Sequence, residues 1–194
     1  VEDTEIREEL LGDTKDALDQ LSAYFSKIRD ITFNDRTQIP LSCEKIELHQ
    51  LVDEMAKRIA GPSGKTIEYE NHIDPSVELY ADPSHVSNIL LNLFENAVKY
   101  SAESVTIKID GKKEENGSVI ITVSDNGNGI AQSDLGKVFT RFYRGNATRS
   151  DIPGMGLGLA YVKLLVEAHG GTISVESHTE APDRGTCFTI NIPQ

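Results

Sequence analysis

Two glycine-rich runs hold the residues whose types and spacing best suit a small anionic ligand. Asp125-Asn126-Gly127-Asn128-Gly129 follows an apolar stretch that predicts a strand, and Gly154-Met155-Gly156-Leu157-Gly158-Leu159 opens a predicted helix. Glycine lets backbone amides approach a ligand closely, and the free N–H groups of a helix N-terminus suit a phosphate. An aspartate at a strand end can accept a hydrogen bond from an amine such as that of adenine. By itself, each run is more often a loop that needs positive φ angles.

A third set of polar residues lies on a predicted helix that begins at Asp82-Pro83, because aspartate caps a helix and proline fits its first position. Asn92, Asn96 and Lys99 follow at steps of four and three residues, so they share one face, opposite an apolar face. An amide oxygen can be a ligand of Mg²⁺, and a lysine can neutralise a phosphate. On these residues alone, a merely exposed polar face remains the alternative.

The segment between the two glycine runs is basic, although the chain as a whole is acidic. Its residues 131–150 contain four cations against one acidic residue, Asp134, and these cations are Lys137, Arg141, Arg144 and Arg149. We expect residues 130–153 to form a lid over phosphates, with a solvated charged loop as the alternative. The net charge of −12 argues against nucleic acid as a partner, because a phosphate backbone would be repelled.

Length and composition indicate one medium-sized domain with an appendage. The chain has 194 residues, of which 38% are hydrophobic, and it contains no apolar run long enough to cross a bilayer and no signal peptide. Its first residue is Val rather than Met, which indicates an excised fragment. Cys43 and Cys187 have no metal-binding spacing and are expected to be reduced thiols.

The appendage is predicted to be a single helix over residues 3–33. Its apolar residues recur in two adjoining heptad stripes, which is typical of a helix in a bundle. Such a face needs a partner helix from outside this chain, unless it packs on its own domain. We therefore predict two domains, residues 1–38 and residues 39–194.

The second domain is predicted to alternate strands with helices. Helical periodicity covers 47–60 and 157–168, and a turn over 114–117 joins a hairpin. The predicted strands lie over 41–48, 66–69, 77–81, 105–109, 118–123, 172–177 and 186–192.

Five motifs in this order resemble those of sensor histidine kinases. The motifs are Asn92–Ser101 (the N box), Asp125–Gly129 (the G1 box), Phe139–Arg144 (the F box), Gly154–Leu159 (the G2 box) and Gly185–Phe188 (the last glycine box). Residues 3–33 resemble, more weakly, the second helix of the dimerisation and histidine-phosphotransfer hairpin of these proteins.

The resemblance implies the Bergerat ATP-binding fold, an α/β two-layer sandwich with a mixed sheet covered on one face by helices, here preceded by one long helix. It implies that Asp125 binds the adenine amino group and that Asn96 is a ligand of Mg²⁺, with Asn92 nearby. Phe139 and Phe142 would anchor the lid to the core.

The remaining ATP contacts that the resemblance implies fall into three groups. Lys99, Tyr100 and Arg144 would contact phosphates or ribose. Gly127, Gly129 and Thr186 would shape or support the adenine pocket. The residues of the lid hinge and its phosphate-facing amides would be Gly154, Met155, Gly156, Leu157, Gly158 and Leu159.

One departure concerns the phosphoacceptor histidine, which in this family stands in an H box. None of the five histidines, His49, His72, His85, His169 and His178, has that context. We therefore expect a fragment that binds Mg²⁺-ATP but has no catalytic nucleophile of its own. Its implied partners are ATP, the kinase's own hairpin, a response regulator and a second copy in the full-length homodimer. The implied location is the cytoplasmic part of a membrane-bound bacterial protein.

Two alternatives compete with a kinase. The first is an ATPase of the gyrase, mismatch-repair or chaperone class, which shares the fold but has a glutamate general base where this chain has Asn92. The second is a catalytically silent interaction module that docks a partner through residues 3–33.

Overall fold

The computed structural model describes Gly12, Thr14, Ile28 and residues 39–59, 64–145 and 154–194. The chain divides into two units, Val1–Ile39 and Pro40–Gln194. Gly12, Thr14 and Ile28 have helical backbone, but the rest of the predicted helix over 3–33 lies outside the described residues. The role of that helix in a hairpin therefore stays a prediction.

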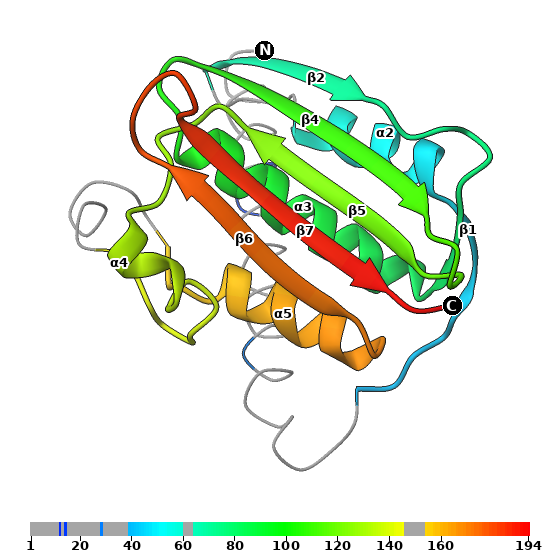
Figure 1. The fold of residues 1–194 in the computed structure, drawn as a ribbon. Coiled ribbons are helices and arrows are strands. Elements are labelled where there is room, and N and C mark those ends of the chain that lie inside the picture. Colours follow the sequence, from blue (N-terminus) through cyan, green and yellow to red (C-terminus); the bar gives the residue numbers. More distant parts are fainter. Residues whose placement is uncertain (1–11, 13, 15–27, 29–38, 60–63, 146–153) are drawn as a thin grey trace, which may run out of the picture. The chain divides into compact units, whose positions relative to one another are not determined.

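A five-stranded mixed sheet forms one layer of the second unit (Figure 1). Its strands, in spatial order, are β2 (Thr66–Asn71), β4 (Ser104–Lys113), β5 (Val119–Asp125), β7 (Gly185–Ile192) and β6 (Thr172–His178). β2 and β4 run parallel, and the other neighbouring strands run antiparallel. The sheet is mixed, as the resemblance implied.

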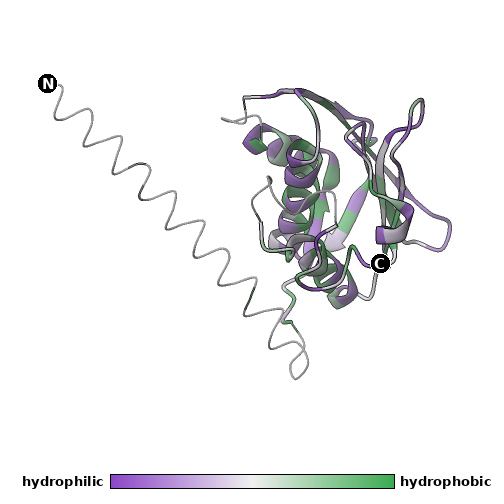
Figure 2. Ribbon diagram, turned by 90° about the vertical axis from the view of Figure 1, so that its left-hand side faces the viewer, coloured by the Kyte–Doolittle hydropathy of each residue, from purple (hydrophilic) through white to green (hydrophobic). Residues whose placement is uncertain are grey.

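Helices α2 (Leu48–Ile59), α3 (Pro83–Lys99) and α5 (Gly158–Ala168) form the second layer and cover one face of this sheet. Figure 2 shows the two layers from the side. The core lies between them, where apolar side chains of α3 meet alternate residues of the strands. Its members, each at most 2% exposed, include Leu90, Leu93, Phe94, Ile109, Ile121 and Ile190. The α/β two-layer sandwich is confirmed.

A second, smaller sheet pairs β1 (Glu44–Glu47) with β3 (Glu78–Ala81) in antiparallel fashion. The predicted strand over 41–48 is thus shorter than expected. It ends because Leu48, which is fully buried, already belongs to α2.

The start of α3 is set by its capping residue, as predicted. One carboxylate oxygen of Asp82 accepts hydrogen bonds from the backbone N–H groups of Ser84 (3.0 Å) and His85 (3.2 Å). The other oxygen accepts from the N–H of Ser42 at 2.9 Å, and Pro83 occupies the first turn. This cap determines where the helix begins and hence where its polar residues lie.

The turns of the domain follow the expected residue types. Gly117 has φ +88° in the tight turn between β4 and β5, and Gly170 has φ +70° just after α5. A short helix, α4 (Gln132–Leu135), was not predicted, because four residues carry no readable periodicity. In the described part of the chain, no helix combines the length and apolar composition that a membrane crossing requires.

Candidate functional site

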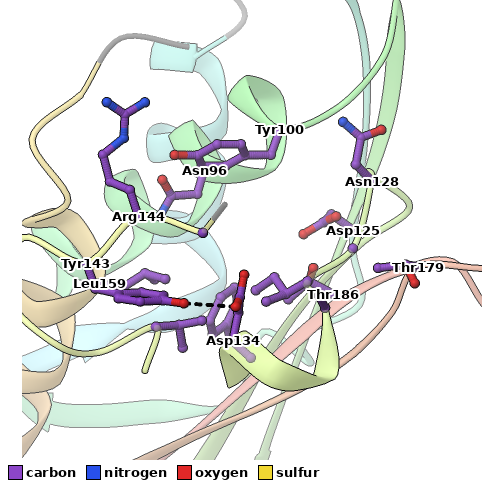
Figure 3. Close-up of a pocket in the computed structure, with 16 residues that line it drawn as sticks. Asn96, Tyr100, Asp125, Asn128, Asp134, Tyr143, Arg144, Leu159, Thr179 and Thr186 are labelled. Atoms are coloured by element: carbon purple, nitrogen blue, oxygen red, sulfur yellow. Dashed lines mark hydrogen bonds between the residues drawn. The ribbon is translucent and has the colours of Figure 1, made fainter. Parts of the chain in front are cut away.

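A cavity of about 340 Å³ lies where the ends of α3, β5 and β7 face α4 and the start of α5 (Figure 3). Its volume lies within the range of small-molecule sites. Seven of the residues singled out from the sequence line it, and these are Asn96, Tyr100, Asp125, Gly129, Arg144, Leu159 and Thr186.

Asp125 ends β5 and faces Thr186 of β7 across the ladder, so both side chains contribute to one wall (Figure 3). The Asp125 carboxylate accepts a hydrogen bond from the Gly127 N–H at 2.8 Å. Burial raises the pKa of Asp125, while hydrogen bonds from the backbones of Gly127 and Thr186 act in the opposite direction. A partly buried carboxylate held in this way can accept a further hydrogen bond from a ligand.

Two glycines make this turn possible. A Cβ on Gly127 would lie 2.7 Å from Oδ1 of Asp125 and 3.1 Å from the carbonyl oxygen of Tyr100. Gly129 has φ +72°, and a Cβ there would overlap the carbonyl of His178. Gly127 does not itself line the cavity, but it lets the turn pack between Asp125 and the end of α3.

Asn92 is placed differently from its neighbour Asn96. Its side chain is only 4% exposed, and its Nδ2 donates to the carbonyl oxygen of Asn88 at 2.6 Å. Its Oδ1 lies 3.1 Å from the position that a Cβ on Gly158 would take. The first turn of α5 therefore covers this part of α3, and the alternative of an exposed polar face does not hold for Asn92. It lies behind the cavity wall and does not line the cavity.

The cationic side of the site contains Lys99 and Arg144. Burial lowers the pKa of Lys99, the positive charge of Arg144 lowers it further, and Glu95 has the opposite effect. The Lys99 ammonium lies 5.2 Å from the centroid of the Tyr100 ring, and a Cβ on Gly154 would overlap it. Two like charges near one cavity favour an anion that relieves their repulsion.

A backbone hydrogen bond joins the predicted lid to the glycine run that follows it. Phe142 donates its N–H to the carbonyl oxygen of Gly156 at 2.9 Å, and Gly156 has φ +70°. Next to it, Met155 is 42% exposed, whereas Leu157 is buried. The lid residues 146–153, including Arg149, lie outside the described residues.

The prediction that Phe142 anchors the lid to the core is wrong. The Phe142 side chain is 66% exposed. Its backbone has φ 62° and donates its N–H to Gly156, and in this conformation the ring lies in solvent. The Phe139 ring does pack, edge to face, on the ring of Phe188, with centroids 6.4 Å apart.

Several lining residues carried no role in the sequence-based predictions. Asn128, Tyr143 and Phe188 stand inside the recognised motifs, so their motifs were the available signal. Asp134 accepts a hydrogen bond from the Tyr143 hydroxyl at 2.9 Å (Figure 3). Thr179 follows β6 and reaches the cavity only through strand pairing, which leaves no local signal.

The donor set fits a magnesium ion that takes most of its ligands from phosphates and water. Among the described residues, no group of three or more His, Cys, Asp or Glu could hold a metal. The amide of Asn96 lines the cavity, and amide oxygens are suitable ligands for hard cations. Such a site would be completed by its nucleotide and would not form a separate all-protein cage.

Comparisons with known proteins identify the family. Residues 81–194 match the family of histidine kinase-, DNA gyrase B- and HSP90-like ATPases. The sensor protein RprX of Bacteroides fragilis is 32% identical over 191 residues, which cover 94% of this chain and 35% of RprX. The sensor histidine kinase WalK of Bacillus subtilis is 35% identical over 179 residues, or 90% of this chain and 27% of WalK. The chain thus spans only about a quarter to a third of the length of these relatives.

Solved structures of histidine kinases support the same family assignment. The mycobacterial sensor histidine kinase MprB superposes with a TM-score of 0.69 at 30% identity, covering 77% of this chain and 97% of that one. Full-length ShkA in complex with AMPPNP gives a TM-score of 0.77 at 26% identity, over 92% of this chain and 36% of ShkA. These relatives favour the kinase interpretation over a gyrase-type ATPase. The chain belongs to the family of histidine kinase-, DNA gyrase B- and HSP90-like ATPases, as an ATP-binding catalytic domain of the sensor histidine kinase type.

Proposed function

We propose that the cavity binds Mg²⁺-ATP and that the domain transfers the γ-phosphate to a histidine on a phosphotransfer hairpin. The observation that supports this most strongly is that Asp125 and Asn96 line the same cavity, although they come from a strand end and a helix. The carboxylate of Asp125 can accept a hydrogen bond from an amine, and the amide oxygen of Asn96 can be a ligand of a hard cation.

The adenine would lie at the wall formed by Asp125 and Thr186. Both side chains line the cavity, and the pairing of β5 with β7 keeps them adjacent. Gly127 and Gly129 would act by shaping the turn that holds the carboxylate. Ile130 and Val138 also line the cavity, and their branched apolar side chains could pack against the faces of a purine ring.

The triphosphate would extend from this wall toward Lys99 and Arg144. Tyr100 and Leu159 line the same cavity, and the Gly154–Gly158 turn lies beside Lys99 at the start of α5. Asn96 would hold Mg²⁺, with Asn92 behind it, and the ion would neutralise phosphate charge when bound. Phosphoryl transfer depends mainly on such positioning and charge neutralisation.

The residues available here favour transfer to an external acceptor over hydrolysis. At Asn92, where the hydrolases of this fold have a glutamate base, the buried amide donates to Asn88 and cannot take a proton from water. Glu95 is exposed and is not among the described residues that line the cavity. No histidine in the described part of the chain lines it either. The acceptor would come from the hairpin to which residues 3–33 are predicted to contribute.

The wider assignment follows from the same proposal. The phosphohistidine would pass its phosphate to an aspartate of a response regulator, and the parent protein would act as a homodimer with this domain on the cytoplasmic side of a membrane. RprX is named a sensor protein, and WalK and the mycobacterial MprB are named sensor histidine kinases, which supports a role in signalling.

Phosphorylation of a chain joined to a complete phosphotransfer hairpin, with its phosphoacceptor histidine, tests the proposal. With ATP labelled at the γ-phosphate, we expect acid-labile, base-stable label on the protein, and we expect Asp125→Asn in the same extended chain to lose it. Rapid release of free phosphate without labelled protein would favour the ATPase alternative. A chain that binds no nucleotide would favour the interaction module.

A further inference from the structure

We propose that Ser177 is a positioning residue that holds the Thr186 hydroxyl as a hydrogen-bond acceptor, so that the cavity selects a 6-amino purine over a 6-oxo purine. The inference rests on the proposed function, because it concerns the base preference of the same cavity. Ser177 lies outside the five recognised motifs, and it does not itself line this cavity.

Ser177 stands near the end of β6 and is only 3% exposed. Three polar groups surround its hydroxyl oxygen. The carbonyl oxygen of Gly185 lies at 2.6 Å, the N–H of Ile130 donates at 2.8 Å, and Oγ1 of Thr186 lies at 3.0 Å. The hydroxyl therefore connects the segment after the Asp125 turn with the start of β7.

The positions of the protons follow from this geometry. A carbonyl oxygen has no proton, and two oxygen atoms 2.6 Å apart would repel each other unless a proton lay between them, so the Ser177 O–H donates to Gly185. The two lone pairs of Ser177 Oγ then accept from the Ile130 N–H and from the Thr186 O–H. These three bonds use the full capacity of a hydroxyl group.

The Thr186 hydroxyl has then given its only proton to Ser177. It can offer a ligand nothing but lone pairs, and it lines the cavity beside Asp125, which accepts hydrogen bonds when it is ionised. This wall therefore presents acceptors to the edge of a bound base. An exocyclic amine supplies the matching donors, whereas the oxygen of a 6-oxo purine meets lone pairs and is disfavoured.

Without the Ser177 hydroxyl, the Thr186 O–H is released and can turn toward the cavity as a donor. A 6-oxo group then finds a partner, so discrimination is expected to weaken even where the fold survives. An effect on packing alone would change the affinity for both nucleotides equally. The ratio of the two dissociation constants therefore separates a positioning role from a structural one.

The test measures dissociation constants for ATP and inosine triphosphate by calorimetry. We expect Ser177→Ala to reduce the preference for ATP by about tenfold, the effect of about one hydrogen bond. Thr186→Val should reduce it as well, and Ser177→Ala added to Thr186→Val should cause no further change in the ratio. Ser174→Ala is the matched control, because Ser174 is an exposed serine on the same strand and should leave the ratio unchanged.

Three results would overturn the inference. The first is an unchanged ratio in Ser177→Ala that still binds ATP. The second is an unchanged ratio in Thr186→Val, which keeps the test decisive even where Ser177→Ala does not fold. The third is a further change on adding Ser177→Ala to Thr186→Val. A wild-type chain that binds neither nucleotide would instead contradict the proposed function itself.

Discussion

Asn128 donates its backbone N–H to the carbonyl oxygen of Tyr100 at 3.0 Å, which attaches the turn after β5 to the C-terminal end of α3. Asp125 precedes Asn128 in the same turn, and Asn96 lies one helical turn before Tyr100 on α3. The bond therefore sets the distance between the proposed adenine-binding and metal-binding residues. In the proposed complex, Mg²⁺-ATP would contact Asp125 and Asn96 at the same time.

Gly127→Ala is expected to disturb this attachment. The new Cβ would approach both the Asp125 carboxylate and the Tyr100 carbonyl, so either the carboxylate or the turn must move. We expect ATP affinity, measured by calorimetry, to fall by at least about tenfold, because about one charged hydrogen bond is lost.

Gly136→Ala is the matched control for that substitution. Gly136 has φ −67°, and a Cβ there meets nothing within 4 Å. Its ATP affinity should equal that of the wild type. Equal ATP affinities in Gly127→Ala and the wild type would contradict the account of the turn.

The pH dependence of ATP binding is expected to report on Asp125. Burial raises the pKa of this carboxyl, so on acidification it is protonated at a higher pH than an ordinary aspartate and stops accepting from the amine. Affinity measured across a pH series should therefore begin to fall above the usual aspartate range. The fall should be absent from the residual binding of Asp125→Asn.

The same raised pKa has a consequence for folding. A carboxyl whose folded-state pKa exceeds its unfolded value stabilises the fold at low pH, and this contribution is lost as the pH rises through the folded-state pKa. At neutral pH, Asp125→Asn should thus keep or raise the free energy of unfolding of the ligand-free chain while it weakens ATP binding. Loss of stability in urea titrations would show instead that the carboxylate is a structural requirement.

Lys65 is expected to stabilise the end of α3 that carries Lys99 and Tyr100. Its Nζ donates to the carbonyl oxygens of Val98 (2.6 Å) and Ser101 (2.9 Å), where a helix leaves its carbonyls unpaired. Lys65→Met should lower the free energy of unfolding by about 1–3 kcal/mol in urea titrations.

Lys108→Met provides the comparison for Lys65→Met. Lys108 pairs at 3.2 Å with Glu70 on the exposed surface, and such pairs contribute about 0–1 kcal/mol. If the two variants lose the same stability, the capping role of Lys65 is wrong.

The two phenylalanines of the F box are expected to behave differently. Phe142 has φ 62° and an exposed ring, so Phe142→Gly relieves backbone strain and should keep the melting temperature unchanged or raise it. Phe139→Ala removes the contact with Phe188 and should lower the free energy of unfolding by at least about 1 kcal/mol. A larger loss in Phe142→Gly than in Phe139→Ala would restore the anchoring role first predicted for Phe142.

Local chemistry made much of the fold predictable. Asp82-Pro83 predicts the start of α3, and Gly117 and Gly170 lie at turns that need positive φ. These signals depend on residues close in sequence, so they can be interpreted without knowing the tertiary contacts. The order of the five motifs then indicated which elements surround one ligand.

The burial and the contacts of several site residues depend on long-range packing, which could not be predicted from the sequence. Asn92 is buried only because the first turn of α5 covers it, and Ser177 meets Thr186 only because β6 pairs with β7. The exposure of Phe142 depends on its backbone bond to Gly156 across the lid. Periodicity and composition carry no information about such partners.

The most direct test of the central claim is calorimetric titration of the chain with ATP in the presence and absence of Mg²⁺. We expect saturable binding by the wild type that Mg²⁺ strengthens, loss of that strengthening in Asn96→Ala, and binding at least about tenfold weaker in Asp125→Asn. Equal ATP binding by the wild type and both variants, or no binding by any of them, would contradict the account.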